Sequence, residues 1–219
     1  MILLHAFPLD GTMWAGIDGR PIDYPGTGSL AGWADLVAAA MEGPQVVCGL
    51  SMGGYAAFEL VRRHPGKVAG LVLADTRAEC DSADARAGRD AAVERVRREG
   101  VAAQFEASHA ALFRSTPDAA VVQRARSIAV AQPAERVIAM LLALRDRADS
   151  RDLLAGISVR TTVICGSQDA ITPPAGARAM AGAIPGARYI EIADAGHLSV
   201  MEQPGAFAQA VSLNSETSR

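Results

Sequence analysis

The sequence predicts an α/β protein built on a mostly parallel sheet of about six strands, with helices on both sides. Short, continuous apolar runs alternate along the 219 residues with longer stretches whose apolar residues recur at helical spacing. Such runs are typical of strands buried on both faces of a parallel sheet, and their alternation with helices indicates repeated βαβ units. The composition, 50% hydrophobic and 21% charged, is that of a globular chain long enough to bury its own core.

The first third of the chain is expected to alternate short strands with helices that have one apolar face. The strands are expected at residues 2–4, 21–24, 46–49 and 68–74, and the helices at residues 30–41 and 54–63. Pro21 and Pro25 bracket the second strand. Because proline has no N–H to donate to a neighbouring strand, these residues suit an edge strand. A contact between two copies of the chain is the alternative use of that edge.

The middle of the chain breaks this rhythm. No run between Asp75 and about Pro133 resembles a strand, and the charges that crowd residues 84–100 fit the solvated face of a helix. Further helices are expected at residues 101–113 and 118–130. Residues 76–132 are therefore expected to form a helical cap inserted over the sheet, which leaves residues 1–75 and 133–219 as the core. Three apolar cap residues could line a pocket or simply pack the cap onto the core: Phe105, Leu112 and Phe113.

The last third returns to the alternation of helix and strand. A helix over residues 133–147 is expected to bring the chain back to the core. It is followed by strands at residues 161–165 and 189–192 and by helices at residues 175–183 and 204–213.

Charge and cysteine content narrow the possible partners and location. The net charge of −3 gives no reason to expect nucleic acid or an anionic membrane as a partner. The three cysteines are an odd number, and Cys48 and Cys165 lie inside strand-like runs, which disfavours a disulfide framework. No apolar stretch approaches the roughly 20 residues that span a bilayer, and the N-terminus does not resemble a secretory signal. A cytoplasmic location is expected.

A serine lies where a buried strand meets a helix. Gly49, Ser51 and Gly53 match Gly-x-Ser-x-Gly directly after the strand at residues 46–49 and before the helix at residues 54–63. This pattern in this context is typical of a nucleophile elbow, in which a sharp turn projects the serine hydroxyl above the sheet. Ser51 is therefore the candidate nucleophile.

A serine hydroxyl needs a base within hydrogen-bond reach, and the base needs an acid that holds its tautomer. Of the four histidines, His197 directly follows the last strand-like run and can return to the carboxyl edge of the sheet, where the elbow points. Asp169 follows the strand at residues 161–165 and meets the same edge. We therefore expect His197 as base and Asp169 as acid. Asp75, at the end of residues 68–74, occupies an equivalent place and stays a rival acid.

The order Ser51, Asp169, His197 along the chain is that of the α/β-hydrolases. The chain resembles a small α/β-hydrolase over about residues 1–213, on four segments: His5-Ala6-Phe7-Pro8, residues 49–54, residues 166–169 and Ala195-Gly196-His197. The resemblance implies an oxyanion hole made by the backbone N–H groups of Phe7 and Met52. Ala6 stands where the family usually has glycine. Only four residues precede His5, where the family usually has two more strands, so a reduced sheet is expected.

The resemblance also implies a reaction. The expected activity is hydrolysis of a small, mostly apolar carboxylic ester or lactone through an acyl-enzyme, with no metal and no organic cofactor. Residues 169–174 and 197–204 look like those of 3-oxoadipate enol-lactonase-like members. The alternatives are a carbon–carbon bond hydrolase or a non-hydrolytic lyase or cyclase of a biosynthetic pathway. A ligand-binding protein without catalysis is a third possibility on the same fold. The oligomeric state is not predicted.

Overall fold

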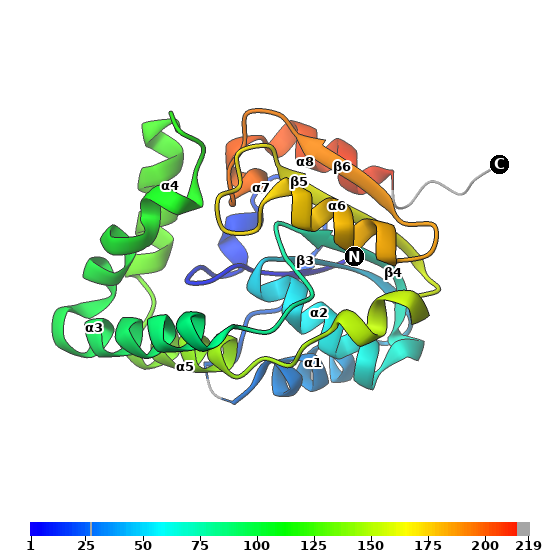
Figure 1. The fold of residues 1–219 in the computed structure, drawn as a ribbon, viewed down its shortest axis with the longest axis horizontal. Helices are drawn as coiled ribbons and strands as arrows, with labels where there is room; N and C mark the ends of the chain where they lie inside the picture. The colour runs from blue at the N-terminus through cyan, green and yellow to red at the C-terminus, as the bar shows by residue number, and fades with distance from the viewer. Residues whose placement is uncertain (27, 214–219) are drawn as a thin grey trace.

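The computed structural model describes residues 1–26 and 28–213, and these form one six-stranded sheet in the order β2-β1-β3-β4-β5-β6 (Figure 1). Every neighbouring pair of strands is parallel, as the sequence predicts. The strands are β1 (Ile2–Leu4), β2 (Arg20–Pro21), β3 (Gln45–Leu50), β4 (Val68–Ala74), β5 (Arg160–Gly166) and β6 (Arg188–Ile192).

Both faces of the sheet are buried, which explains the continuous apolar runs. Along β4, Leu71 and Leu73 point into one apolar cluster, whereas Val72 and Ala74 point into another. The first cluster lies under α1 (Leu30–Ala39), α2 (Met52–Arg63) and α6 (Pro174–Ala183). The second lies under the 3₁₀ turn η1 (Gly11–Trp14), α7 (Ser199–Glu202) and α8 (Pro204–Ser212). The carboxyl ends of the strands are left for loops that carry polar residues.

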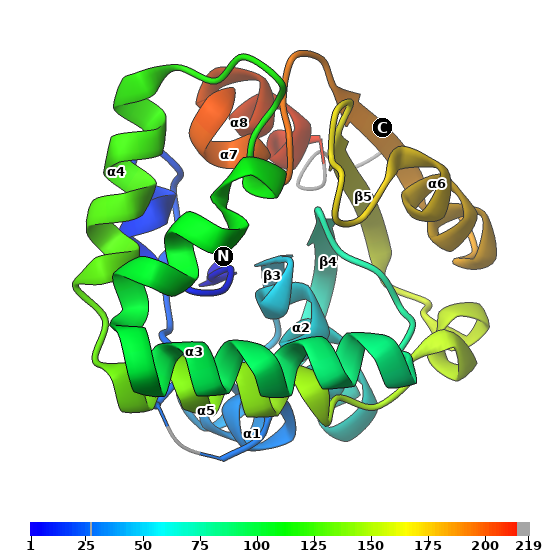
Figure 2. The ribbon, with the colours of Figure 1, turned by 60° about the vertical axis from the view of Figure 1, so that its left-hand side comes forward.

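The segment between β4 and β5 is helical, as the sequence predicts. It contains α3 (Ala83–Ser108), η3 (His109–Leu112), α4 (Ala119–Val130), α5 (Ala134–Arg145) and η4 (Arg151–Gly156). Helix α3 runs along α5 (Figure 2), and valines of α3 pack against Val137 and Leu141 of α5. Among the described residues no single helix is both long and apolar enough to span a bilayer; only α4 and α5 together reach that length and composition, and they are bent by 99°.

Apolar cap residues fasten the cap to the sheet. Phe105, Leu112 and Phe113 are all buried and share a cluster with Leu50 and Ile164 of the strands. These three side chains therefore pack the cap onto the core. Packing therefore accounts for Phe105 and Leu112, whereas Phe113 also lines a cavity together with Arg114 and Val122.

A buried carboxylate holds the cap where it leaves and rejoins the core. The Asp81 side chain is fully buried and forms ion pairs with Arg77, Arg89 and Arg147, at 3.3, 3.1 and 2.6 Å. Arg77 follows β4, Arg89 belongs to α3, and Arg147 follows α5. One side chain thus connects the beginning and the end of the helical segment between β4 and β5.

Three element boundaries differ from the sequence expectation. Strand β2 is Arg20–Pro21 and not residues 21–24, because the N–H of Tyr24 donates to the His5 ring and does not pair with a strand. Helix α2 begins at Met52 and not at Gly54, because the glycines of the elbow form its first turn. Gly100 (φ 84°) breaks Ala83–Ser108 into two helices, so a separate helix begins near residue 101 as the sequence predicts, but it ends at Ser108 and not at residue 113, because residues 109–112 form the 3₁₀ turn η3.

Candidate active site

Ser51 occupies a sharp turn between β3 and α2. Its φ of 52° is in the left-handed region, which is unfavourable for a residue with a side chain and needs support from its surroundings. A Cβ atom on Gly49 would collide with the backbone of Gly53, and one on Gly53 would collide with the Leu4 carbonyl. Both glycines of the motif are therefore required by the close approach of strand, turn and helix. The Ser51 N–H donates to the Ala74 carbonyl at 2.9 Å, which anchors the turn to β4.

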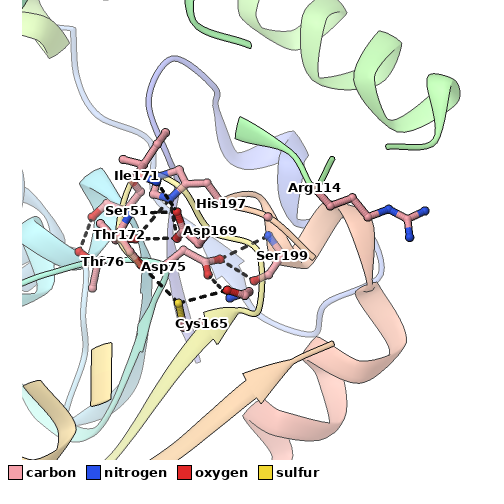
Figure 3. Close-up of polar contacts among 12 residues, drawn as sticks. Ser51, Asp75, Thr76, Arg114, Cys165, Asp169, Ile171, Thr172, His197 and Ser199 are labelled. Carbon is pink, nitrogen blue, oxygen red and sulfur yellow. Dashed lines mark hydrogen bonds and ion pairs between the residues drawn. The ribbon is translucent and has the colours of Figure 1, made fainter. Parts of the chain in front are cut away.

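The three predicted residues form one hydrogen-bonded chain (Figure 3). His197, in the loop between β6 and α7, has Nε2 2.8 Å from the Ser51 Oγ. Its Nδ1 is 2.8 Å from Asp169 Oδ2. His197 and Asp169 are buried, whereas Ser51 is partly exposed. The arrangement has the geometry of a nucleophile, a base and an acid that orients the base.

Asp169 is held by donors on both oxygens. Its Oδ1 accepts the N–H groups of Ile171 and Thr172 at 2.8 and 2.9 Å, and its Oδ2 also accepts the Thr172 hydroxyl at 2.6 Å. Burial alone would raise the pKa of Asp169, but the hydrogen bonds from His197 and Thr172 outweigh it and lower the pKa. An ionised Asp169 keeps a proton on Nδ1 of His197, which leaves Nε2 free to accept a proton from Ser51. The sequence analysis did not identify Thr172.

Asp75, the rival acid, has other partners. It is fully buried, its Oδ1 accepts the Gly166 N–H at 2.8 Å, and its Oδ2 accepts the Ser199 hydroxyl at 2.5 Å. Ser199, which the sequence analysis did not consider, is also fully buried and uses its hydroxyl on Asp75. Neither residue is therefore in a position to replace Asp169 or Ser51. The other histidines lie elsewhere: His64 contacts Asp35, and His109 begins η3 in the cap.

The loop after β1 lies against the start of α2 and is held by His5. The Tyr24 N–H donates to His5 Nε2 at 3.0 Å, so the proton of this buried ring is on Nδ1, which donates to the Ala6 carbonyl at 3.0 Å. The Leu9 N–H donates to the same carbonyl at 2.9 Å. Because a peptide unit is planar, fixing the Ala6 carbonyl also fixes the direction of the Phe7 N–H on its opposite side. Phe7 thus stays the expected partner of Met52, whose N–H is at the unpaired first turn of α2.

His5 should make the protein less stable in mild acid. Burial lowers the pKa of His5 from 6.5 to about 4, so the unfolded chain takes up a proton at a pH where the folded chain does not. Stability is therefore lost as the pH falls from about 6.5 to about 4, by about 3 kcal/mol. Denaturant unfolding of wild type and His5→Asn across this range should show the wild type losing that much relative to the variant. His109→Asn is the matched control. If the difference in unfolding free energy between wild type and His5→Asn does not change with pH, the assignment is wrong.

The cap is hydrogen-bonded to the loops of both Asp169 and His197. The Leu198 N–H donates to the Leu112 carbonyl, and Ser115 donates through its N–H and its hydroxyl to the Gln168 side chain, all at 3.0 Å. The nearly buried Glu202 side chain accepts the N–H groups of Gly196 at 2.7 Å and Arg114 at 3.1 Å. The cap segment at residues 112–115 therefore connects the loop of Asp169 to the loop of His197. These contacts involve ordinary polar residues, and no local sequence pattern identifies them.

Asp75, Cys165 and Asp169 are the described residues that come closest to a metal site. One potential ligand atom from each lies within 4.8 Å of the other two. The carboxylates, however, already accept hydrogen bonds from Gly166, Ser199 and Thr172, and burial raises the pKa of the Cys165 thiol, which keeps it protonated. A neutral thiol is a poor ligand. The cluster is better suited to a hydrogen-bond network than to a metal ion.

The chain is similar to known proteins over nearly its whole length. A profile described as "Alpha/beta hydrolase family" matches residues 1–210. The pimeloyl-(acyl-carrier protein) methyl ester esterase of Aromatoleum aromaticum is 29% identical, with 93% of each chain covered. A thermophilic esterase from Thermogutta terrifontis has a TM-score of 0.90 at 38% identity, over 97% of this chain and 87% of the esterase. The enol-lactonase from Burkholderia xenovorans LB400 has a TM-score of 0.84 at 28% identity, over 97% of this chain and 90% of the lactonase.

Proposed function

The chain belongs to the α/β hydrolase family and is esterase-like, and from this premise we propose that it is a serine hydrolase of small carboxylic esters or lactones. The observation that carries the proposal is the continuous contact from Ser51 through His197 to Asp169, at 2.8 Å for each of the two hydrogen bonds. A serine hydroxyl is a weak nucleophile at neutral pH, and these two consecutive hydrogen bonds activate it.

In the first half-reaction the Ser51 Oγ attacks the carbonyl carbon of the ester while His197 Nε2 takes the hydroxyl proton. The N–H groups of Phe7 and Met52 donate hydrogen bonds to the carbonyl oxygen as negative charge develops on it. Two such donors contribute several kcal/mol to stabilising the transition state. His197 then gives its proton to the alcohol oxygen, the C–O bond breaks, and the acyl group remains on Ser51.

In the second half-reaction water replaces the alcohol. His197 Nε2 removes a proton from the water, and the water oxygen attacks the acyl carbon. The oxyanion that forms is stabilised by the same two N–H groups. The Ser51 oxygen leaves with the proton from His197, and the carboxylic acid is released. For a lactone the leaving alcohol stays attached to the acyl chain, so the product is a single hydroxy acid.

The surroundings of Ser51 favour a small and mostly apolar substrate. Ile171, whose N–H donates to Asp169, is partly buried, as is Phe7 on the loop after β1. The cap segment at residues 112–115 lies against the loops of His197 and Asp169. Relatives that act on a methyl ester and on an enol-lactone are consistent with this class. We expect turnover of short acyl esters and small lactones.

The experiment that tests the proposal is intact mass after brief exposure to a small fluorophosphonate. Wild type should gain one adduct and Ser51→Ala should gain none, because only an activated serine displaces fluoride from phosphorus. Turnover of short p-nitrophenyl esters and small lactones should accompany the adduct. An adduct without ester or lactone turnover would favour the carbon–carbon hydrolase or lyase alternative. Binding of ligand with neither adduct nor turnover would favour the non-catalytic alternative.

A further inference from the structure

A second carboxylate lies directly behind the candidate triad, and the reaction proposed above does not use it. Asp75 follows β4, the strand between β3 and β5, and therefore stands at the same carboxyl edge as Ser51 and Asp169. It is fully buried, with a carboxylate oxygen within 4.8 Å of one of Asp169. Figure 3 shows Asp75 between Asp169 and Ser199.

The two oxygens of Asp75 connect the two loops that carry acid and base. Oδ1 accepts the N–H of Gly166, the last residue of β5, three residues before Asp169. Oδ2 accepts the hydroxyl of Ser199 at 2.5 Å and its N–H at 3.3 Å, two residues after His197. The loops also touch directly, because a Cβ atom on Gly166 would collide with the Gly196 carbonyl.

Keeping a carboxylate in this place is unfavourable for stability. Burial and then the charge of Asp169 raise the pKa of Asp75 to about 7, although His197, Ser199 and Gly166 act in the opposite direction. The other titratable groups nearby are the thiols of Cys48 and Cys165, whose pKa values are raised by burial, so they stay neutral. Among the described residues, His197 is therefore the group facing Asp75 that can become a cation. A neutral side chain would avoid the cost of the charge, and such costs are concentrated at functional sites.

We propose that Asp75 is a positioning residue that ties the Asp169 loop to the His197 loop and places a second negative charge behind the imidazolium of His197. The proposal rests on the function proposed above, because the imidazolium forms when His197 takes the Ser51 proton. Asp169 orients the ring through a direct hydrogen bond. Asp75 acts through Gly166 and Ser199 without touching the ring or the substrate, and its charge acts on His197 in the neutral and alkaline range, because its pKa is raised to about 7.

The first test is an NMR titration of the histidine ring protons, with the His197 signal identified from its loss in His197→Gln. In Asp75→Asn the titration midpoint of His197 should move to lower pH, because the carboxylate whose ionisation near pH 7 favours the imidazolium is gone. Ser199→Ala removes a hydrogen bond that lowers the pKa of Asp75, so in this variant the His197 midpoint should move in the same direction by a smaller amount. Asparagine tolerates the φ of 44° at position 75, and Asp75→Gly is the second variant should Asp75→Asn not fold. If the His197 midpoint is unchanged in whichever of the two Asp75 variants folds, the proposal is wrong.

Kinetics provide the second readout and separate this proposal from the function itself. Asp75→Asn should lower kcat for a short p-nitrophenyl ester by about 10- to 100-fold, with KM within about twofold, because the charge acts only when the imidazolium forms. The acidic limb of its kcat/KM profile should move to lower pH with the NMR midpoint. A loss of activity with an unmoved limb would show a merely structural role and overturn the proposal. If wild type forms no fluorophosphonate adduct, the proposed function fails, whereas the NMR midpoint still decides whether the Asp75 charge acts on His197.

Discussion

Replacing Ser51 with alanine should lower kcat for a short p-nitrophenyl ester by about 10⁴- to 10⁶-fold. The variant loses the oxygen that attacks the carbonyl carbon, and His197 is left with no hydroxyl to deprotonate at 2.8 Å. KM should change little, because the N–H groups of Phe7 and Met52 and the apolar surface around Ile171 are kept. Steady-state kinetics and a pre-steady-state burst measure both effects: the burst of p-nitrophenol should vanish together with the steady-state rate.

Two features of the variant make the result interpretable. Alanine in place of Ser51 experiences the same left-handed backbone as the serine, so the free energy of unfolding should change by less than about 1 kcal/mol. Ser127→Ala, on the exposed face of α4, is the matched control and should keep full activity. If Ser51→Ala keeps more than about a hundredth of the wild-type kcat, another group performs the attack and the proposed acyl-enzyme is wrong.

The positions of the candidate nucleophile, base and acid are predictable because each has a local sequence signal. Gly49, Ser51 and Gly53 have to be spaced as they are because strand, turn and helix meet at van der Waals distance. His197 and Asp169 each follow a buried strand, and parallel strands end at one edge. A parallel sheet of about six strands follows from the same alternation and is confirmed by the pairing of the described strands, with β2 at the edge as its prolines indicate.

The groups that hold the site are not predictable in this way. Asp75 meets Ser199 across 124 residues of sequence, and the Arg114 N–H meets Glu202 across 88. Asp75 follows a buried strand, as Asp169 does, but no pattern predicts its contact with Ser199 or that of Arg114 with Glu202, because each contact depends on how two loops approach each other. The shortness of β2 has the same origin: a ring of the neighbouring loop, that of His5, takes the N–H of Tyr24 that would otherwise extend the strand.

Replacing Asp169 with asparagine should lower kcat by about 10⁴-fold, through the wrong tautomer of His197. Asp169 Oδ1 accepts two backbone N–H groups, from Ile171 and Thr172, and an amide nitrogen there would face both donors. The amide oxygen of the variant must therefore take the Oδ1 place, which turns its NH₂ group toward His197 Nδ1. Nδ1 then has to accept a hydrogen bond, so the ring proton moves to Nε2. With that proton, Nε2 donates to the Ser51 hydroxyl and has no lone pair to take its proton.

The contrast with Asp75→Asn decides which carboxylate is the acid. Asp75 accepts from Gly166 and Ser199 and not from the imidazole, so its asparagine variant leaves the tautomer of His197 unchanged. Its loss of kcat should be at least about a hundredfold smaller than that of Asp169→Asn. Parallel kinetics of the two variants, with folding checked by circular dichroism, measure this difference. If Asp75→Asn abolishes turnover and Asp169→Asn does not, Asp75 supports the base during catalysis and the hydrogen bond between His197 and Asp169 is not the one on which the reaction depends.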